Sequence, residues 1–268
     1  MIVFDHAGIS EQGPVRERNE DCIASHSPED DAVRARKGSL LVVADGVSGQ
    51  RGGEVASALA VQTLMATYYA MGRKPAAALR GAFEAANLRV CDEAMARQDC
   101  RRMETTLTAL LLVESQAVIG HIGDTRVYRI RAGTVEQLTR DHSEVGELVR
   151  MQILTVEEAQ RHPRRHIITR TVGSELLTQA DYRTEALQQG DAFVLCSDGL
   201  WEPLAPDHMV EAVSESPATA CRMLIERALA HGSSDNLSLH VVKVKGVPVA
   251  PAATGFLRRA LSRLGAGR

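Results

Sequence analysis

Two apolar stretches that each end in Asp-Gly constrain the fold of this chain more than any other feature. Residues 38–45 read Gly-Ser-Leu-Leu-Val-Val-Ala-Asp, and residues 193–198 read Phe-Val-Leu-Cys-Ser-Asp. The first stretch does not alternate between apolar and polar residues, which predicts a strand covered on both faces. Each strand would carry a carboxylate at its tip, Asp45 or Asp198, followed by a glycine that permits close backbone approach.

The rest of the chain predicts strands and helices in separate blocks. We expect further strands at 2–9 and 21–26 around a turn, at 182–187 and 237–244, and a four-stranded antiparallel meander at 106–113, 117–122, 126–130 and 134–138. Strands that are apolar on both faces need cover on both. The sequence therefore predicts an α+β fold with two packed antiparallel sheets and helices outside each sheet.

Three long helices are predicted. One starts near Gly52, a second follows Pro75, and a third runs from an N-cap at Ser216 to Gly232. Their expected inner faces are, in chain order, Val55, Ala58, Val61, Met65 and Tyr68; Leu79, Phe83, Ala86 and Val90; and Cys221, Leu224, Ile225, Ala228 and Leu229.

Composition argues against several classes of function. The chain has 268 residues, enough for one large domain or two small ones, and its net charge of −3 gives no basic field for nucleic acid. Five cysteines, an odd number with no Cys-x-x-Cys, indicate buried free thiols in a reducing compartment. We find neither a signal peptide nor a membrane span, and we expect a monomer in the cytoplasm.

Composition along the chain also suggests boundaries. We expect one domain over residues 1–245, with a polar, irregular insertion at 141–180. Residues 246–255 read as a linker, and 256–268 as a basic amphipathic tail with four arginines. Two interpretations of the tail stay open: a frayed end, or a segment that docks on an acidic partner or a membrane surface.

Acidic residues in short turns are the candidate site. They are Asp21, Asp45, Asp124, Asp198 and Asp235. Each one alone would usually be a turn residue. Gathered without a cation, they would repel one another and raise several pKa values. Mg²⁺ and Mn²⁺ prefer such oxygen ligands, and two ions about 3.5–4 Å apart can activate a bridging water for phosphoester hydrolysis. Arg16 lies close to Asp21 in sequence, and its guanidinium suits a phosphate.

The order of these motifs carries a family resemblance. They are Arg16-x-x-x-Glu20-Asp21, Ala44-Asp45-Gly46-Val-Ser-Gly49-x-x-Gly52-Gly-Glu54, Thr105-Thr106-Leu-Thr-Ala, Gly120-x-x-Gly123-Asp124-Thr-Arg126-x-Tyr128, Leu138-Thr-x-Asp141-His142-Ser143, Ser197-Asp198-Gly199-Leu-Trp201 and Asp235-Asn236. Over about residues 5–245 the chain resembles the metal-dependent serine/threonine protein phosphatases of type 2C, in their compact bacterial form. The resemblance implies a four-layer αββα sandwich.

The resemblance also implies roles for particular residues. Asp45 would bridge two Mn²⁺ or Mg²⁺ ions and Gly46 would offer its carbonyl. Asp198 and Asp235 would bind the second ion, Glu20 and Asp21 would bind directly or through water, and Asp124 with Asp198 would form a third, weaker position. Arg16 would bind the phosphate, and residues 141–180 would be the flap that borders the cleft. The implied activity is hydrolysis of phosphoserine and phosphothreonine in proteins, in opposition to a bacterial serine/threonine kinase.

Two positions depart from the family pattern. Glu104 stands where the family usually has glycine, which predicts either a local clash or extra negative charge near the metals. Val47 stands where some members have a histidine proposed as general acid, so the sequence names no proton donor. Two other functions remain open: a non-catalytic phosphoprotein-binding module, supported by Glu104 alone, and an unrelated two-metal phosphodiesterase or nuclease.

Three further features have simpler interpretations. His142 is expected to make a structural hydrogen bond. Trp201 is expected to be a core anchor. His162 and His166 have metal-like spacing, but Pro163 and the neighbouring arginines favour a solvated basic loop.

Overall fold

The computed structural model of the protein describes residues 1–47, 52–96 and 102–248. Its strands form two five-stranded antiparallel sheets, one in the order β1-β10-β9-β6-β7 and the other in the order β2-β3-β4-β5-β8. The strands are β1 (Val3–Glu11), β2 (Asp21–His26), β3 (Ser39–Asp45), β4 (Leu107–Val113), β5 (Gln116–Ile122), β6 (Arg126–Arg131), β7 (Thr134–Gln137), β8 (Asp181–Ala186), β9 (Ala192–Cys196) and β10 (Leu237–Gly246).

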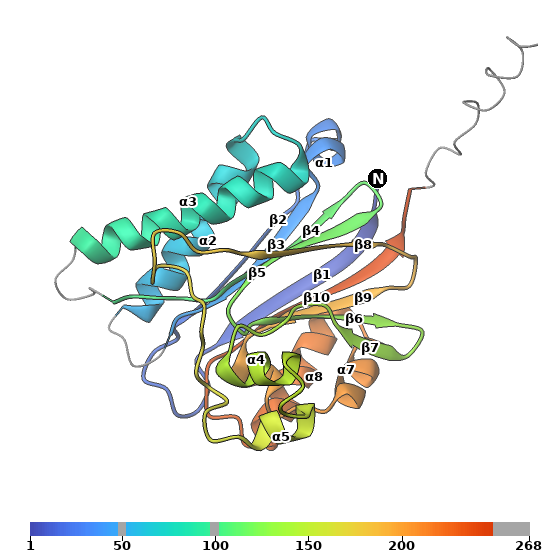
Figure 1. Ribbon diagram of the computed structural model, residues 1–268. Coiled ribbons are helices and arrows are strands. Elements are labelled where there is room, and N and C mark those ends of the chain that lie inside the picture. The colour runs from blue at the N-terminus through green and yellow to red at the C-terminus, as the bar shows by residue number, and fades with distance from the viewer. Residues whose placement is uncertain (48–51, 97–101, 249–268) are drawn as a thin grey trace, which may run out of the picture.

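Helices cover the outer face of each sheet, as Figure 1 shows. On the β3 sheet lie α2 (Gly53–Ala70) and α3 (Pro75–Ala96), whose buried residues pack against Leu40 and Val42 of β3. On the β9 sheet lie α6 (Asp198–Trp201), α7 (Pro206–Ala212) and α8 (Pro217–Ala230), packed against Val194 and Cys196 of β9. The remaining helices are α1 (Asp31–Lys37), α4 (Glu144–Arg150) and α5 (Val156–Arg161).

A third apolar cluster fills the space between the sheets. It joins Leu41 and Val43 of β3 to Phe193 and Leu195 of β9, all of them almost fully buried. Alternate residues of β3 thus face the helices and the other sheet, which is why the strand is apolar throughout. The predicted α+β fold, a four-layer αββα sandwich, is confirmed.

Several local predictions were wrong. The strands from 106 to 138 do not form one meander: β4 and β5 pair in one sheet, while β6 and β7 pair in the other. β1 and β2 likewise belong to different sheets. On α2 the buried face runs through Ala56, Ala60 and Leu64 rather than through Ala58 and Met65.

The predictions for the last helix agree better with the structure. The Ser216 hydroxyl accepts from the Thr219 N–H, Pro217 opens α8, and Gly232 adopts a left-handed φ of 89° just after it. Leu229, however, is partly exposed rather than buried. Cys22, Cys91, Cys196 and Cys221 are free thiols, while Cys100 and the basic tail lie outside the described residues. In the described ranges, no helix is both long and apolar enough to cross a membrane.

The topology brings the acidic turns to one end of the sandwich. β3 and β9 both end there, β2 and β10 both begin there, and the turn between β5 and β6 lies at the same end. The pairing of Asp21 with Asp45 and of Leu239 with Cys196 fixes this alignment in each sheet.

His240 is buried between the sheets without a normal side-chain hydrogen bond. It lies on β10 opposite Gly8, where a β-carbon would come within 2.4 Å of its Nδ1. Both ring nitrogens lack a hydrogen bond of good geometry, although nearby carbonyls of β1, β2 and β3 favour the charged ring slightly. Burial is the larger effect and lowers the pKa of His240 to about 4.

We expect His240 to weaken the protein in acid. Its pKa is about 4 when folded and near 6.5 when unfolded. The unfolded chain therefore binds more protons in this window, and stability falls as the pH drops from 6.5 to 4. The loss is about 1.4 kcal/mol per pH unit. Chemical denaturation of His240→Leu at pH 7 and pH 4 should show a smaller acid loss than the unsubstituted protein, by about 3 kcal/mol. Equal losses would contradict this assignment.

Candidate active site

Asp21 and Asp45 stand side by side at the ends of β2 and β3. They are opposite each other in the strand register. The Ser197 hydroxyl, which comes from the other sheet, donates to Asp21 Oδ2 at 2.8 Å. Asp21 Oδ1 is buried and has no hydrogen-bond partner. A buried carboxylate oxygen without a donor is costly unless a cation meets it.

Two threonines just before β4 hold the backbone N–H and carbonyl of Asp45. Its N–H donates to Thr106 Oγ1 at 2.9 Å, and its carbonyl accepts from the N–H of Thr106 and from Thr105 Oγ1, each at 2.8 Å. On Asp45 itself these bonds use main-chain atoms only. They fix the backbone of Asp45 and do not engage its carboxylate.

Asp124 and Asp198 complete the centre from the other sheet. The Trp201 indole N–H donates to the Asp124 carbonyl at 3.0 Å, which joins the β5–β6 turn to the helix that Asp198 opens. Asp124 Oδ1 is a second buried carboxylate oxygen with no partner. The Arg126 guanidinium lies 3.3 Å from the centroid of the Trp201 ring and binds both carboxylate oxygens of Asp141.

The acids raise one another's pKa values. Burial is the largest cause for all four of Asp21, Asp45, Asp124 and Asp198, and repulsion adds to it. The pKa of Asp21 rises to about 7 and that of Asp198 to about 6, while those of Asp45 and Asp124 rise well above the usual value. The charges of Asp21, Asp198, Asp124 and Asp235 all act on Asp45. The five predicted acids therefore gather, with Asp45 at their centre.

Arg16, Glu20 and Asp235 form the outer side of the centre. Arg16 Nη2 binds Asp235 Oδ2 at 2.6 Å, and contact with Asp235, reinforced by the charges of Asp198 and Asp45, raises its pKa. The Glu20 carboxylate lies against Gly53, at the positive N-terminal end of α2. A hollow of about 200 Å³ opens here, lined by Arg16, Glu17, Arg18 and Glu20.

Asn236 holds the loop that carries these residues. Its Oδ1 accepts from the Glu20 N–H, and its Nδ2 donates to the carbonyls of Gln12 and Arg18, all at 2.8–2.9 Å. The Asp235-Asn236 pair thus joins a charged contact with Arg16 to a backbone clamp on Glu20.

Position 46 requires glycine because the backbone of Gly53, at the start of α2, lies very close to it. A β-carbon there would lie 2.4 Å from the Gly53 carbonyl oxygen. No side chain fits without moving the start of α2, so the Asp45-Gly46 signal reflects a real steric limit.

The donor set fits a hard divalent cation. It offers several buried carboxylates, two of which have unpartnered oxygens, and these are the ligands that Mg²⁺ and Mn²⁺ prefer. Among the described residues, no three His, Cys, Asp or Glu side chains already converge as a complete metal site. Arg16 now occupies Asp235, so this carboxylate would have to exchange Arg16 for a cation on binding.

Glu104 neither clashes nor points at the acids. Its carbonyl accepts from the Val47 N–H at 2.9 Å, and its Oε2 accepts from the Thr171 hydroxyl at 2.7 Å. Its charge is felt at Cys91, where it helps burial to raise the pKa of the thiol. The carboxylate is therefore directed toward the flap.

The histidines and Trp201 lie as expected. His142 Nδ1 accepts from the Gly123 N–H at 3.1 Å, which confirms a structural hydrogen bond. Trp201 packs against the core of the β9 sheet. His166 is exposed and lies 3.2 Å from Glu202, and His162 Nδ1 accepts from the Arg164 N–H.

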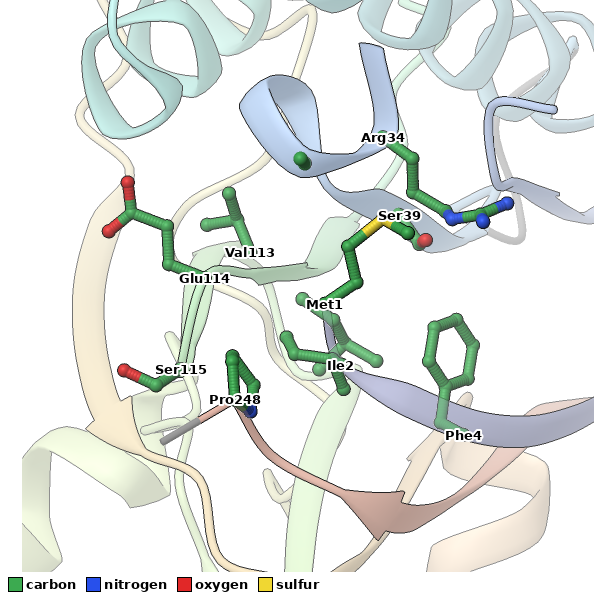
Figure 2. A pocket seen from close by; sticks show the side chains of 11 residues that line it. Met1, Ile2, Phe4, Arg34, Ser39, Val113, Glu114, Ser115 and Pro248 are labelled. Atoms are coloured by element: carbon green, nitrogen blue, oxygen red, sulfur yellow. The ribbon is translucent and has the colours of Figure 1, made fainter. Parts of the chain in front are cut away.

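A larger cavity lies at the opposite end of the sandwich. It measures about 360 Å³ and is lined mainly by apolar residues such as Met1, Phe4, Leu112 and Pro248 (Figure 2). Glu114 is its single carboxylate. It therefore has no means of holding a divalent cation and is separate from the acidic centre.

Comparison with known proteins agrees with the geometry. The family model for protein phosphatase 2C matches residues 18–233. The serine/threonine phosphatase stp of Listeria monocytogenes is 31% identical over 242 residues, which cover 87% of this chain and 93% of that protein. The serine/threonine protein phosphatase PstP of Mycobacterium tuberculosis is 34% identical over 245 residues, covering 91% of this chain and 45% of that protein.

Solved structures show the same fold. The crystal structure of the catalytic domain of PstP in complex with two manganese ions has a TM-score of 0.79 and 32% identity, and the match covers 92% of this chain and all of that one. The chain therefore belongs to the protein phosphatase 2C family. It is an enzyme of the serine/threonine protein phosphatase class.

Sequence reasoning did not assign the residues that hold the acids in place. Ser197, Asn19, Arg126 and Asp141 had no assigned role, although Ser197 directly precedes Asp198 and Asn19 Oδ1 accepts from the Asp21 N–H. Their positions inside the quoted motifs were the available signal. Their partners are distant in sequence, and only the fold reveals them.

Removal of one acid should stabilise the metal-free protein. The raised pKa of Asp198 means that its charged form is unfavourable in the fold at neutral pH. In EDTA at pH 7.5, we expect Asp198→Asn to raise the free energy of unfolding by roughly 1–3 kcal/mol. Denaturant titration measures this, and Asp207→Asn, at an exposed acid on α7, is the matched control.

With Mn²⁺ added, the unsubstituted protein should become more stable than Asp198→Asn. Saturation at 100 times the dissociation constant stabilises a binding protein by about 2.7 kcal/mol. We expect that gain in the unsubstituted protein and a clearly smaller one in Asp198→Asn. A metal-free Asp198→Asn variant less stable than the parent would contradict the repulsion that we describe.

Proposed function

We propose that this protein hydrolyses phosphoserine and phosphothreonine in proteins with two Mn²⁺ or Mg²⁺ ions, and that it opposes a bacterial serine/threonine kinase. One observation supports this most: the charges of four other acids, drawn from both sheets, add to burial in raising the pKa of Asp45, with Arg16 beside them. Such a centre is unfavourable without cations and suits them when they are present.

Each predicted ligand has a place in this proposal. Asp45 would hold both ions, and the Gly46 carbonyl would be a further ligand on the same turn. Asp198 and Asp235 would bind the second ion, Glu20 and Asp21 would bind directly or through water, and Asp124 with Asp198 would offer a third, weaker position. When bound, the ions activate a water and neutralise charge on the phosphate.

The chain's own residues bind and orient the phosphate. Arg16 now occupies Asp235, and it would turn its guanidinium to the phosphate oxygens once a cation replaces it there. The hollow beside Arg16 gives the phosphate access from solvent. The second residue after Asp45 is Val47 rather than a histidine. We therefore assign no protein group as proton donor.

We also propose how the chain is divided. Residues 1–245 form the catalytic domain, and 141–180 form its flap, which connects β7 to β8 and contains α4 and α5. Residues 246–268 form a linker and a basic tail. A phosphoprotein substrate is the proposed partner, together with a cognate kinase.

The alternatives have less support. The binding-module hypothesis relied on Glu104, whose carboxylate bonds to Thr171 instead of disturbing the acids. It would be favoured by phosphopeptide binding without turnover. A nuclease or phosphodiesterase would need a surface for nucleic acid, and the net charge of −3 argues against one.

Phosphate release from a phosphothreonine peptide tests the proposal. We expect release with Mn²⁺ and none in EDTA. Asp45→Ala should lose about 10²-fold or more in kcat, because it removes the ligand shared by both ions. Full activity in EDTA, or in Asp45→Ala, would contradict the two-metal centre.

Arg16 should act mainly on substrate binding. We expect Arg16→Ala to raise KM for the peptide by about tenfold, through loss of charge-assisted hydrogen bonds to the phosphate. Arg222→Ala, an exposed arginine on α8, is the matched control and should leave KM unchanged. An unchanged KM in Arg16→Ala would remove this residue from the phosphate site.

A further inference from the structure

We propose that Glu104 is a positioning residue that holds the returning end of the flap, at Thr171 and Val172, against residues 104–106 beside Asp45, and thereby sets the affinity for a phosphopeptide. The effect on affinity rests on the proposed function; the mechanical role does not.

One short segment, residues 104–106 just before β4, lies between the acidic centre and the flap. Thr105 is bridged antiparallel to Gly46 on one side and to Val172 on the other. The Thr105 N–H donates to the Val172 carbonyl at 3.1 Å, and the Val172 N–H donates back at 2.8 Å. On the other side, Thr105 Oγ1 donates to the Asp45 carbonyl. A shift of the returning flap at Val172 would therefore reach Asp45 through a single residue.

Glu104 contacts both sides of this arrangement. Its carbonyl accepts from the N–H of Val47, two residues after Asp45, and its side chain accepts from the Thr171 hydroxyl. Thr171 is only 5% exposed, so water competes poorly for this bond. A charged acceptor makes it stronger than a neutral hydrogen bond. Glycine at this position would offer the backbone contact and no contact to Thr171.

Two main-chain bonds between Thr105 and Val172 also hold the returning end of the flap, and the Glu104–Thr171 bond adds a side-chain contact beside them. The first flap residue, Asp141, is bound by Arg126 on β6. Beyond Thr171, Asn87 of α3 accepts from the Gly173 N–H and donates to the Glu175 carbonyl, which ties the return to a helix rather than to the acids. Among the described residues, Glu104–Thr171 is the side-chain hydrogen bond between the returning end of the flap and residues 104–106 beside Asp45.

If the returning end of the flap is held less tightly, the affinity for a phosphopeptide falls, because fewer molecules are in the arrangement that binds it. If only a fraction of molecules hold the flap in the binding arrangement, the apparent dissociation constant rises by the inverse of that fraction. A small phosphate ester such as p-nitrophenyl phosphate has no peptide to meet the flap. Its hydrolysis should therefore be insensitive to Glu104.

The experiment compares Glu104→Gly and Thr171→Val with two conservative variants, Glu104→Gln and Thr171→Ser. The first pair removes the acceptor or the donor, and the second pair retains them. Glu175→Gln is the matched control, because this exposed carboxylate in the same turn makes no hydrogen bond or ion pair in the described part of the chain. Hydrogen exchange over residues 167–173 and steady-state kinetics on both substrates are measured with Mn²⁺.

We expect faster exchange at 167–173 in Glu104→Gly and Thr171→Val, with residues 39–44 unchanged. KM for a phosphothreonine peptide should rise about five- to tenfold. The kcat and the kinetics on p-nitrophenyl phosphate should stay within about twofold of the parent, as a population effect on binding alone leaves them. The double variant should be no worse than either single one, because both break the same bond. Thr171→Ser and Glu175→Gln should match the parent, and Glu104→Gln, which keeps an acceptor without its charge, should fall between the parent and Glu104→Gly.

Two results would overturn the proposal. One is unchanged exchange and unchanged KM in both Glu104→Gly and Thr171→Val. The other is an equal loss of kcat on both substrates, which would place Glu104 at the acidic centre itself. If the parent protein hydrolyses neither substrate, the proposed function fails, while the exchange measurement still decides whether Glu104 holds the flap.

Discussion

Repulsion among carboxylates gathered at one end of the sandwich is the constraint on which the rest of the structure depends. Burial is the largest cause of the raised pKa values of Asp21, Asp45, Asp124 and Asp198, and the charges of neighbouring acids raise them further. A fold can keep such a cluster only if the backbone beneath it cannot relax. Thr105 and Thr106 hold the main chain of Asp45, and Trp201 holds that of Asp124. The fixed backbone thus maintains a cluster of carboxylates that repel one another, and bound cations would remove that repulsion.

The αββα architecture supplies that frame. Asp45 ends β3 and Asp198 follows β9, two strands whose side chains are buried on both faces, in the cluster between the sheets and in the clusters under the helices. Packing of this kind fixes the strand tips, and each sheet contributes part of the site. Asp21 and Asp45 come from one sheet, and Asp198 follows a strand of the other. Ser197 links the two sheets through its bond to Asp21. The arrangement of the site therefore depends on the position of the sheets relative to each other.

The sequence predicted the parts of this picture that depend on local pattern. Unbroken apolar runs revealed the buried strands, and the motif order revealed the acids, Arg16 and the layered fold. It failed where partners are distant. Short turns suggested one meander, but the chain crosses between sheets after β5, and nothing local marks that crossing. Glu104 was expected to clash or to add charge at the metals. Its partner Thr171 lies 67 residues away, and only the fold brings the two together.

The most direct test of the central claim is anomalous diffraction at the manganese edge from crystals of this protein grown with Mn²⁺. The account predicts two strong peaks, both within coordination distance of Asp45, with Asp21 or Glu20 near one, Asp198 and Asp235 near the other, and Arg16 released from Asp235. Peaks elsewhere, or no peak beside Asp45 with the Arg16–Asp235 pair intact, would contradict the claim that this acidic cluster exists to hold cations.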